Sequence, residues 1–490
     1  MMMTEGVMAS ELFNGISLNL GDIRVSSIEY DSRQVVKDSC FVAVKGFTVD
    51  GHDFIKDAIS KGASLIVLER KPDFETDVPV VVVPDSRREL AKLSDRFYGH
   101  PSGKLGLIGI TGTNGKTTVS YLVERMLQEA GHSVSRFGTI EYHFPDKTLG
   151  SPNTTPESAD LQKLLAQSAD YRNPRCVLEV SSHGLALGRL KETSFKGGVF
   201  MNLTQDHLDF HPDMNDYENA KRKLFTEFKP EYSVINVDDA VGKKWVSEGL
   251  PGKVITFGFS ENADIRVVER KGGWEGSLLT LATPDGEYSI KTSLPGKHNV
   301  YNVLATIGVG VAEKFSQSVI SKAVSSVKKI PGRFELVEAG QKFAVVVDYA
   351  HTDNALANLL QTARELTTGR VICLFGCGGD RDHGKRKLMG AVADKLADIV
   401  IVTSDNPRTE EPGKIIEEIL TGIESPASER VRVIESRRKA IRDAIELAEQ
   451  GDCVLIAGKG HETYQIIGKK KFDFDDRLIA ADVLKGVGKP

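Results

Sequence analysis

The sequence has few cysteines, the residues that crosslink secreted domains, and it lacks long apolar runs. Its 490 residues include five cysteines, and these are scattered without the paired spacing of a disulfide framework or a zinc site. The longest apolar runs, such as VPVVVV and FAVVV, are far shorter than the roughly 18 residues that a membrane helix needs. The start, residues 1–15, contains acidic residues and no continuous apolar segment of a signal peptide. We therefore expect a cytoplasmic protein without membrane insertion.

An excess of charge of either sign is also missing. The chain has 63 basic and 68 acidic residues, a formal net charge of −5, and no block of like charges. This balance gives no reason to expect a nucleic-acid surface. A content of 40% hydrophobic and 27% charged residues is typical of globular proteins. Because domains usually contain about 100 to 200 residues, we expect three of them.

Two stretches with Pro and Gly predict the domain boundaries. FYGHPSGKLG separates a helical pattern from a strand and a glycine-rich loop, and KKIPGRFELV separates another helical pattern from a new series of strands. These stretches divide the chain into residues 1–98, 99–331 and 332–490.

Short runs rich in β-branched residues alternate with amphipathic stretches, and nearly all of them end in Gly, Ser, Thr, Asp or Asn. This alternation predicts an α/β fold with doubly wound, mostly parallel sheets. Ligands of such sheets bind beyond the carboxyl ends of the strands, so the polar endings are the expected places for chemistry. The runs cover residues 64–68, 104–112, 176–184, 197–204, 232–238, 343–350, 370–376, 397–405 and 452–460.

The string LGLIGITGTNGKTTVSYLVERML, residues 105–127, combines a strand, a glycine-rich turn and a helix. Backbone N–H groups at such a turn can bind phosphates, Lys116 can reach the β- and γ-phosphates, and the Thr117 hydroxyl can ligate Mg²⁺. The spacing differs from the general P-loop, because five residues rather than four separate Gly109 from Gly115. The alternative is a strand-to-helix turn without a ligand.

Two later strand ends offer metal ligands. Glu179 falls inside an apolar strand, where an ionised carboxylate is costly unless it is paired or bound to a metal, and His207 follows the next strand. A satisfied core carboxylate and a capping histidine are the alternatives.

Lys221 stands on the apolar stripe of a predicted helix. The segment YENAKRKLFTEF, residues 217–228, places Tyr217, Ala220, Leu224 and Phe225 on the same face. A side chain that reaches back to water would explain this position. The other hypothesis is an ammonium or a modified lysine that works in a site.

The C-terminal third carries charged residues at several strand ends. Arg333 follows the second boundary, Asp348 and His351 follow a strand, and Arg381 follows LFGCGG, while the last run ends in GKGHE. A cation here could neutralise a transferring phosphoryl group, and the charged turns together favour a ligand pocket. SDNPRTEEP, residues 404–412, presents Arg408 at the end of another strand. Its last residues read as a helix start with Thr409 as the cap and Pro412 in the first turn.

This set of motifs resembles the Mur ligase family over nearly the whole chain. The offset glycine spacing is similar to the family's own version of the loop. The resemblance implies a central P-loop ATPase domain, a Rossmann-like C-terminal domain and a smaller N-terminal α/β domain. It rests on DSR, GTNGKTT, NTTP, EVSSHGLALGR, NLTQDHLDFH, AKRKLF, GKHNVYN, PGRFE, DYAHT, GCGGDRD, DNPR and GKGHE.

The resemblance also implies a reaction. ATP would phosphorylate the side-chain carboxylate of UDP-N-acetylmuramoyl-L-alanyl-D-glutamate, and an amino group of meso-diaminopimelate would attack the acyl phosphate. Residues 1–98 would bind the UDP-sugar, 99–331 would bind ATP, and 332–490 would bind the amino acid. Magnesium, lysines and arginine would offset the repulsion between the anions. The protein would be a cytoplasmic monomer of peptidoglycan precursor synthesis, without nucleic-acid partners.

Site residues follow from the same resemblance, position by position. The ATP phosphates would contact Gly112, Thr113, Asn114, Gly115, Lys116, Thr117 and Thr118, with Asn299 and Asn302 on the adenine side and Arg333 and Asp348 reaching ATP from the C-terminal domain. Mg²⁺ would bind near Thr117, Glu179, His207 and a carbamylated Lys221. The UDP-sugar dipeptide would contact Ser32, Asn153, Thr154, Thr155, Ser181 and Arg189. The amino-acid pocket would comprise His351, Arg381, Asp405, Asn406, Pro407, Arg408, Gly458 and Glu462.

Two alternatives remain open for the function. A lysine-adding ligase of the same branch would face repulsion between Arg408 and the substrate ammonium, whereas a second carboxylate suits an arginine fork. A nucleotide-binding module that forms no bond would need neither the third domain's pocket nor a lysine at position 221 on an apolar stripe.

Overall fold

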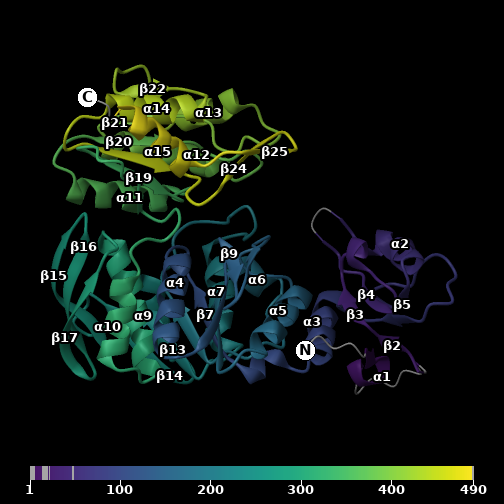
Figure 1. The fold of residues 1–490 in the computed structure, drawn as a ribbon. Coiled ribbons are helices and arrows are strands. Elements are labelled where there is room, and N and C mark those ends of the chain that lie inside the picture. The colour runs from purple at the N-terminus through teal and green to yellow at the C-terminus, as the bar shows by residue number, and fades with distance from the viewer. Residues whose placement is uncertain (1–5, 14–19, 21, 47–48, 488–490) are drawn as a thin grey trace.

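The computed structural model describes residues 6–13, 20, 22–46 and 49–487, which form three α/β units (Figure 1). The expectation about residues 1–15 falls partly outside these ranges. The N-terminal unit lies beside the central unit, and the C-terminal unit lies over the central one in Figure 1. Among the described residues, no helix has the length and apolar character needed to cross a membrane.

The N-terminal unit is a small parallel sheet in the order β3-β4-β5-β6, with a separate β1-β2 pair. Asp85 begins the longest helix of this unit by accepting the backbone N–H of Arg88, as an N-cap aspartate does. The strands are β1 (Val7–Met8), β2 (Arg24–Val25), β3 (Ser27–Glu29), β4 (Ser39–Val42), β5 (Ala63–Leu68) and β6 (Val80–Val82). The helices are α1 (Ala9–Leu12), α2 (Ile55–Ser60) and α3 (Ser86–Phe97), with short 3₁₀ turns at Ser32–Gln34, Gly51–Phe54 and Pro101–Lys104.

The central unit has one large sheet in the order β10-β9-β8-β11-β7-β12-β13-β14-β15-β16-β17. Successive residues of β7 pack into different hydrophobic cores, because successive side chains of a strand point to opposite faces of the sheet. Ile108 packs with α4, α9 and α10, and Leu107 packs with α5, α6, α7 and α8.

The bounds of the central elements are as follows. The strands are β7 (Gly106–Thr111), β8 (Ser133–Phe137), β9 (Glu141–His143), β10 (Thr148–Gly150), β11 (Pro174–Glu179), β12 (Gly197–Phe200), β13 (Tyr232–Asn236), β14 (Lys253–Gly258), β15 (Ile265–Gly273), β16 (Gly276–Thr283) and β17 (Gly286–Thr292). The helices are α4 (Lys116–Glu129), α5 (Ser158–Ala169), α6 (Ser182–Ala186), α7 (Met214–Thr226), α8 (Ala240–Glu248), α9 (Lys297–Ala312) and α10 (Gln317–Ser326).

The C-terminal unit has a sheet in the order β18-β19-β23-β20-β21-β22, parallel except at β18. Helices α11, α12 and α13 cover one face, and α14 and α15 cover the other. The strands are β18 (Glu335–Leu336), β19 (Ala344–Asp348), β20 (Val371–Phe375), β21 (Ile399–Val402), β22 (Val431–Val433), β23 (Cys453–Ala457), β24 (Tyr464–Ile467) and β25 (Lys470–Asp473). The helices are α11 (Asp353–Leu366), α12 (Gly384–Leu396), α13 (Pro412–Leu420), α14 (Arg437–Leu447) and α15 (Asp476–Val487).

The predicted α/β class with mostly parallel sheets is confirmed, and each of the nine apolar runs contains a strand. The sequence interpretation missed the antiparallel extension β15-β16-β17. Its second turn is built around Asp285-Gly286, with Gly286 at a φ of 110°. The five cysteines are all free and buried, in agreement with the expected absence of a disulfide framework.

A buried ion pair ties the helices of the C-terminal unit to its sheet. Arg437 Nε and Nη2 donate to the two carboxylate oxygens of Asp476 at 2.8 and 2.6 Å, and Nη2 also donates to the Ala457 carbonyl at 2.9 Å. Both side chains are fully buried. This pair therefore fixes α14 and α15 against the end of β23.

Replacing Asp476 with Ala should lower the free energy of unfolding by about 3 to 5 kcal/mol, because it leaves the Arg437 charge buried without a partner. Urea unfolding followed by circular dichroism measures the change. The control is Asp443→Ala, which removes the exposed Lys439–Asp443 pair and should leave the unfolding midpoint unchanged. Equal effects of the two substitutions would contradict a structural role of the buried pair.

Candidate active site

A cavity of about 720 Å³ lies between the central and C-terminal units. Its wall includes most of the residues predicted to contact ATP, metal and the sugar substrate. These are Thr113, Asn114, Gly115, Lys116, Thr117, Thr118, Asn153, Thr154, Thr155, Ser181, Arg189, His207, Lys221, Asn299, Asn302, Arg333 and Asp348. The wall also includes His351, which was predicted for the amino-acid pocket.

The glycine-rich loop runs from the end of β7 to the start of α4. Gly112 and Gly115 have φ values of 146° and 91°, which L side chains rarely adopt, and a Cβ at Gly115 would lie 2.6 Å from Asn302 Oδ1. Asn202 holds the loop from the next strand, because its Oδ1 accepts the Asn114 N–H at 2.8 Å. This geometry leaves the helix N-terminus open to the cavity, as a phosphate site requires.

Lys116 and Lys221 converge on one carbonyl oxygen behind this loop. Their Nζ atoms donate to Gly112 O at 2.8 and 3.0 Å, and Lys221 Nζ also lies 4.5 Å from the ring centroid of Tyr217. Lys221 is 1% exposed, so its side chain does not reach back to water. Burial, together with the neighbouring Lys116 charge, moves the pKa of Lys221 well below its ordinary value. The lower pKa favours the neutral amine, which is the nucleophilic form of lysine.

Glu179, at the end of β11, lies behind the cavity wall and is fully buried. The hydroxyls of Thr117 and Thr139 each donate to its Oε2 at 2.9 Å, and the Thr139 N–H donates to Oε1 at 3.2 Å. A Cβ at Gly138 would lie 2.1 Å from Oε1, so the glycine makes room for the carboxylate. These partners satisfy the carboxylate, as one of the sequence interpretations proposed.

The oxygens of Thr117 and Glu179 also fit a Mg²⁺ ion, which prefers hard oxygen ligands. The described residues contain no group of three or more His, Cys, Asp or Glu that could hold a metal ion. A Mg²⁺ ion here would therefore take further ligands from phosphate and water, as Mg²⁺ usually does in nucleotide sites.

His207 lies on the cavity wall with a φ of 56°, and its Nε2 is 3.4 Å from Asp206 Oδ2. Its ring meets the ring of His183 edge to face, with the centroids 4.8 Å apart. Burial lowers the pKa of His207 to about 3, despite the opposing effect of Asp206. The imidazole is therefore neutral near pH 7 and has a lone pair available.

The C-terminal unit reaches the phosphate loop through Arg333. Its Nη2 donates to Thr117 Oγ1 at 3.1 Å, and its guanidinium lies 4.5 Å from the ring centroid of Tyr349. Asp348 holds this segment by accepting the N–H groups of Phe334 and Ala350 at 2.6 and 2.7 Å. Burial raises the pKa of Asp348, and the Arg333 charge opposes this rise.

The predicted amino-acid pocket forms a second cluster, outside the wall of the cavity except for His351. Asn406 Nδ2 donates to Glu462 Oε2 at 2.8 Å, and the fully buried Lys459 donates to Asn406 Oδ1 at 3.1 Å and to Glu462 Oε2 at 3.0 Å. A Cβ at Gly458 would lie 2.7 Å from Asp405 Oδ2. The ends of β21 and β23 therefore meet, as their polar endings predicted.

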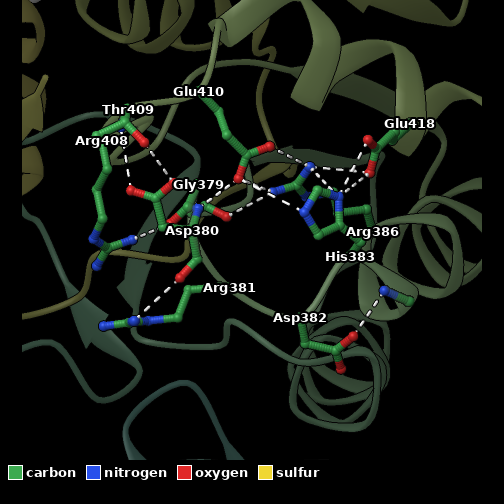
Figure 2. A network of polar contacts seen from close by, with 12 residues as sticks. Gly379, Asp380, Arg381, Asp382, His383, Arg386, Arg408, Thr409, Glu410 and Glu418 are labelled. Carbon is green, nitrogen blue, oxygen red and sulfur yellow. Dashed lines mark hydrogen bonds and ion pairs between the residues drawn. The ribbon is translucent and has the colours of Figure 1, made fainter. Parts of the chain in front are cut away.

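Arg408 stands in the left-handed region with a φ of 51°, and its N–H donates to Ile466 O at 3.1 Å. Its Nη1 donates to Gly379 O at 2.7 Å (Figure 2). Pro407 precedes it, and the Pro407 carbonyl closes the turn by accepting the Glu410 N–H. The direction of the Arg408 side chain is thus fixed by the backbone hydrogen bonds at its base and by the hydrogen bond of its guanidinium.

The expectation that Thr409 caps the next helix is wrong. The Thr409 hydroxyl donates to Asp380 Oδ1 at 2.8 Å, and α13 begins after Glu411, which makes no side-chain cap hydrogen bond. Thr409 precedes the N-cap position, Glu411, by two residues, so it stands too early in the chain to cap this helix. Pro412 occupies the first turn, as expected.

The N-terminal unit contacts the region of the central unit that is predicted to bind the UDP-sugar dipeptide, and Glu157 makes the link. Its Oε2 accepts Arg87 Nη1 of α3 at 2.8 Å and lies 3.3 Å from Arg189 Nε, while Arg189 Nη1 donates to Thr155 O at 3.0 Å. Ser32 is buried in the N-terminal unit, where its carbonyl accepts Lys61 Nζ at 3.1 Å, and it does not line the cavity.

Comparison with known families agrees with this arrangement along the whole chain. Residues 24–98 match the Mur ligase family catalytic domain, 110–310 match the Mur ligase middle domain, and 332–460 match the Mur ligase glutamate ligase domain. The chain belongs to the Mur ligase family. It is accordingly an ATP-dependent ligase that forms amide bonds.

Relatives within the Mur ligase family include UDP-N-acetylmuramoyl-L-alanyl-D-glutamate--2,6-diaminopimelate ligases. The protein of that name from Geobacillus kaustophilus is 43% identical over 475 residues, covering 96% of each chain. The one from Aquifex aeolicus is 42% identical over 480 residues, covering 98% of this chain and 97% of that protein. A solved structure of a ligase of this name superposes with a TM-score of 0.70 at 30% identity, covering 99% of this chain and 100% of that one. The MurF ligase of Thermotoga maritima in complex with ADP shares the fold, with a TM-score of 0.65 at 20% identity and coverage of 94% and 96%.

Sequence reasoning missed several residues of this Mur ligase site. Thr139 reaches Glu179 from a loop that carries no motif. Asp206 precedes His207 in a quoted motif, and Lys459 lies inside GKGHE, so their positions were visible but their burial was not. Asn354 lines the cavity, and its Oδ1 lies 3.5 Å from Asn114 Nδ2.

Substituting Arg333 by Met should lower kcat roughly 10- to 100-fold, because it removes a charged hydrogen bond to the phosphate loop. Phosphate release under saturating substrates measures the effect. Arg270→Met is the matched control, since Arg270 crosses the same interface to Glu365 at 3.6 Å without lining the cavity. A loss of the same size in both variants would show that Arg333 only holds the units together.

Proposed function

We propose that this ligase adds meso-2,6-diaminopimelate to UDP-N-acetylmuramoyl-L-alanyl-D-glutamate, with ATP supplying the energy through an acyl phosphate. The observation that carries the proposal is the pair of guanidiniums of Arg381 and Arg408 beside the Asn406–Lys459–Glu462 cluster. Arg381 Nη1 is held by Asp380 O at 3.2 Å, and Arg408 Nη1 by Gly379 O at 2.7 Å. The names of the relatives agree with this choice of substrates.

Charge explains the choice of amino acid. Diaminopimelate differs from L-lysine by a carboxylate on its distal end, which an arginine fork can bind through two parallel hydrogen bonds. Lysine would bring only an ammonium and would be repelled by Arg408. Attraction of one substrate and repulsion of its competitor gives a small site large discrimination.

The cavity residues would bind the nucleotide and activate the carboxylate. Lys116 and Arg333 would offset the charge of the phosphates, while the loop N–H groups from Gly112 to Thr118 would bind them. Asn299 and Asn302 would face the adenine. Mg²⁺ bound near Thr117, Glu179 and His207 would supply further positive charge. The neutral amine of Lys221 is suited to carbamylation, which would convert it into an anion near that metal.

The sugar substrate would enter between the N-terminal and central units. Asn153, Thr154, Thr155 and Ser181 would contact its dipeptide from the cavity wall, and Arg189 would bind an anionic group. Ser32 would contribute from the N-terminal unit. Because these residues all come from one chain, the protein is proposed to act as a monomer, in the cytoplasm.

Incubating the protein with ATP, Mg²⁺ and UDP-N-acetylmuramoyl-L-alanyl-D-glutamate should give phosphate release when meso-diaminopimelate is added. L-Lysine should give little release, because it lacks the distal carboxylate. Release with neither amino acid would contradict the ligase proposal and favour a nucleotide-binding module. Release with lysine alone would favour the lysine-adding ligase.

Replacing Arg408 by Ala should raise the KM for diaminopimelate roughly 10- to 100-fold, the worth of a charge-assisted hydrogen bond. The KM for ATP should stay unchanged, because Arg408 does not line the nucleotide cavity. Steady-state kinetics with each substrate varied in turn measures both values. An unchanged KM for diaminopimelate would show that Arg408 is only a turn residue.

A further inference from the structure

The guanidiniums of Arg381 and Arg408 are held by neighbouring carbonyls of a single turn. Gly379 O accepts Arg408 Nη1, and Asp380 O accepts Arg381 Nη1. Figure 2 shows both side chains extending to the same side of this turn. The direction of each arginine therefore depends on how rigidly the Gly379–Asp380 peptide is placed.

Asp380 is the central residue of the turn, in the left-handed region with a φ of 53°. Such a conformation is strained for a residue with a side chain and persists only where its surroundings fix it. The Asp380 N–H donates to Glu410 Oε1, and the Asp380 carboxylate accepts the Thr409 hydroxyl at 2.8 Å. The turn is thus held from the loop that carries Arg408.

Arg386, on α12, completes the link from behind. Its Nη1 and Nη2 donate to Glu410 Oε2 and Oε1, both at 2.9 Å, and Nη2 also donates to Gly378 O at 3.2 Å. The Arg386 side chain is fully buried. One guanidinium therefore contacts both loops, and its planar fork fixes their separation.

We propose that Arg386 and Glu410 are positioning residues that set selectivity for a dicarboxylate amino acid by locking the turn that aims Arg381 and Arg408. This inference rests on the proposed function, because it concerns the same amino-acid pocket. Neither residue is proposed to touch the substrate. Their effect is exerted through the Gly379 and Asp380 carbonyls.

A purely structural role, in which Arg386 only joins α12 to α13, can be tested separately from the positioning role. The same network contains a second acceptor of Arg386 for this purpose. Glu418, on α13, also accepts Arg386 Nη1 at 3.0 Å and lies 3.0 Å from His383 Nδ1 (Figure 2). No contact between Glu418 and the Gly379–Asp380 turn is present among the described residues. Glu410 and Glu418 thus share the arginine but differ in their contact with the turn.

Glu410 stays ionised across the working pH range of an enzyme. Its hydrogen bonds with Arg386 lower its pKa to about 2. The Arg386–Glu410 pair is therefore charged wherever the protein is active, because Glu410 does not become protonated at those pH values.

The experiment compares Glu410→Ala with Glu418→Ala in the full-length protein. Glu410→Ala should raise the KM for meso-diaminopimelate about tenfold, and it should reduce the preference for meso-diaminopimelate over L-lysine. A tenfold change lies within the range of coupling energies between residues in contact. kcat and the KM for ATP should change less than about twofold, because the cavity residues are untouched. Glu418→Ala should leave both amino-acid constants near those of the unsubstituted protein.

Glu410→Gln serves as the conservative variant. It keeps an oxygen that can accept the Asp380 N–H but loses its charge, so its KM for diaminopimelate should lie between the values for Glu410→Ala and the unsubstituted protein. Thermal unfolding of all three variants checks that they fold.

An unchanged KM in Glu410→Ala, or equal rises in Glu410→Ala and Glu418→Ala, would overturn the proposal. Failure of the proposed function gives a different result, since the unsubstituted protein would then release no phosphate with diaminopimelate.

Discussion

Parallel strands place their carboxyl ends along one edge, and here two sheets turn that edge toward a shared cavity. The central sheet contributes the phosphate loop after β7, and the C-terminal sheet contributes the residues after β19. One contact between the two edges is a hydrogen bond of 3.1 Å from Arg333 Nη2 to Thr117 Oγ1. Thr117 in turn donates to Glu179, so a cation of one unit is connected to a buried carboxylate of the other through one hydroxyl. Every arrangement of charge in the cavity depends on this meeting of edges.

Burial of several cationic side chains in one place opposes their charged forms. Lys116 and Lys221 donate to the same carbonyl, that of Gly112, and two full charges at this spacing would repel strongly in a poorly solvated environment. Burial and the neighbouring Lys116 charge lower the pKa of Lys221, which favours its neutral form. The pKa of His207, about 3, keeps a further positive charge out of the cavity. A site prepared in this way can receive the negative charge of a nucleotide without first losing a partner, which is the kind of preorganisation that electrostatic catalysis needs.

Features that are local in sequence could be predicted, and features made by tertiary proximity could not. The strands, the phosphate loop and the apolar stripe with Lys221 follow from periodicity and glycine spacing, and all are present. The cap assigned to Thr409 was wrong because α13 begins only after Glu411, while the Thr409 hydroxyl donates to Asp380, 29 residues away in sequence. The Arg386–Glu410 pair has no local signature either, since an arginine on a helix and a glutamate on a loop look like ordinary surface residues until their burial is known. Resemblance to a family supplies residue roles, but it does not supply the network that holds those residues in place.

The order of strands in the C-terminal sheet separates the residues that reach the cavity from those of the predicted amino-acid pocket. β19, which leads to Asp348, is separated from β21, which leads to Arg408, by β23 and β20, or three strand spacings of about 4.8 Å. The Gly458 N–H donates to Asp348 O at 3.1 Å, so the two regions are joined at the edge itself. The hydrogen-bonded sheet therefore holds the segments that follow β19, β23 and β21 at fixed separations, so the position of Asp348 and the position of Arg408 are set by the same set of strands.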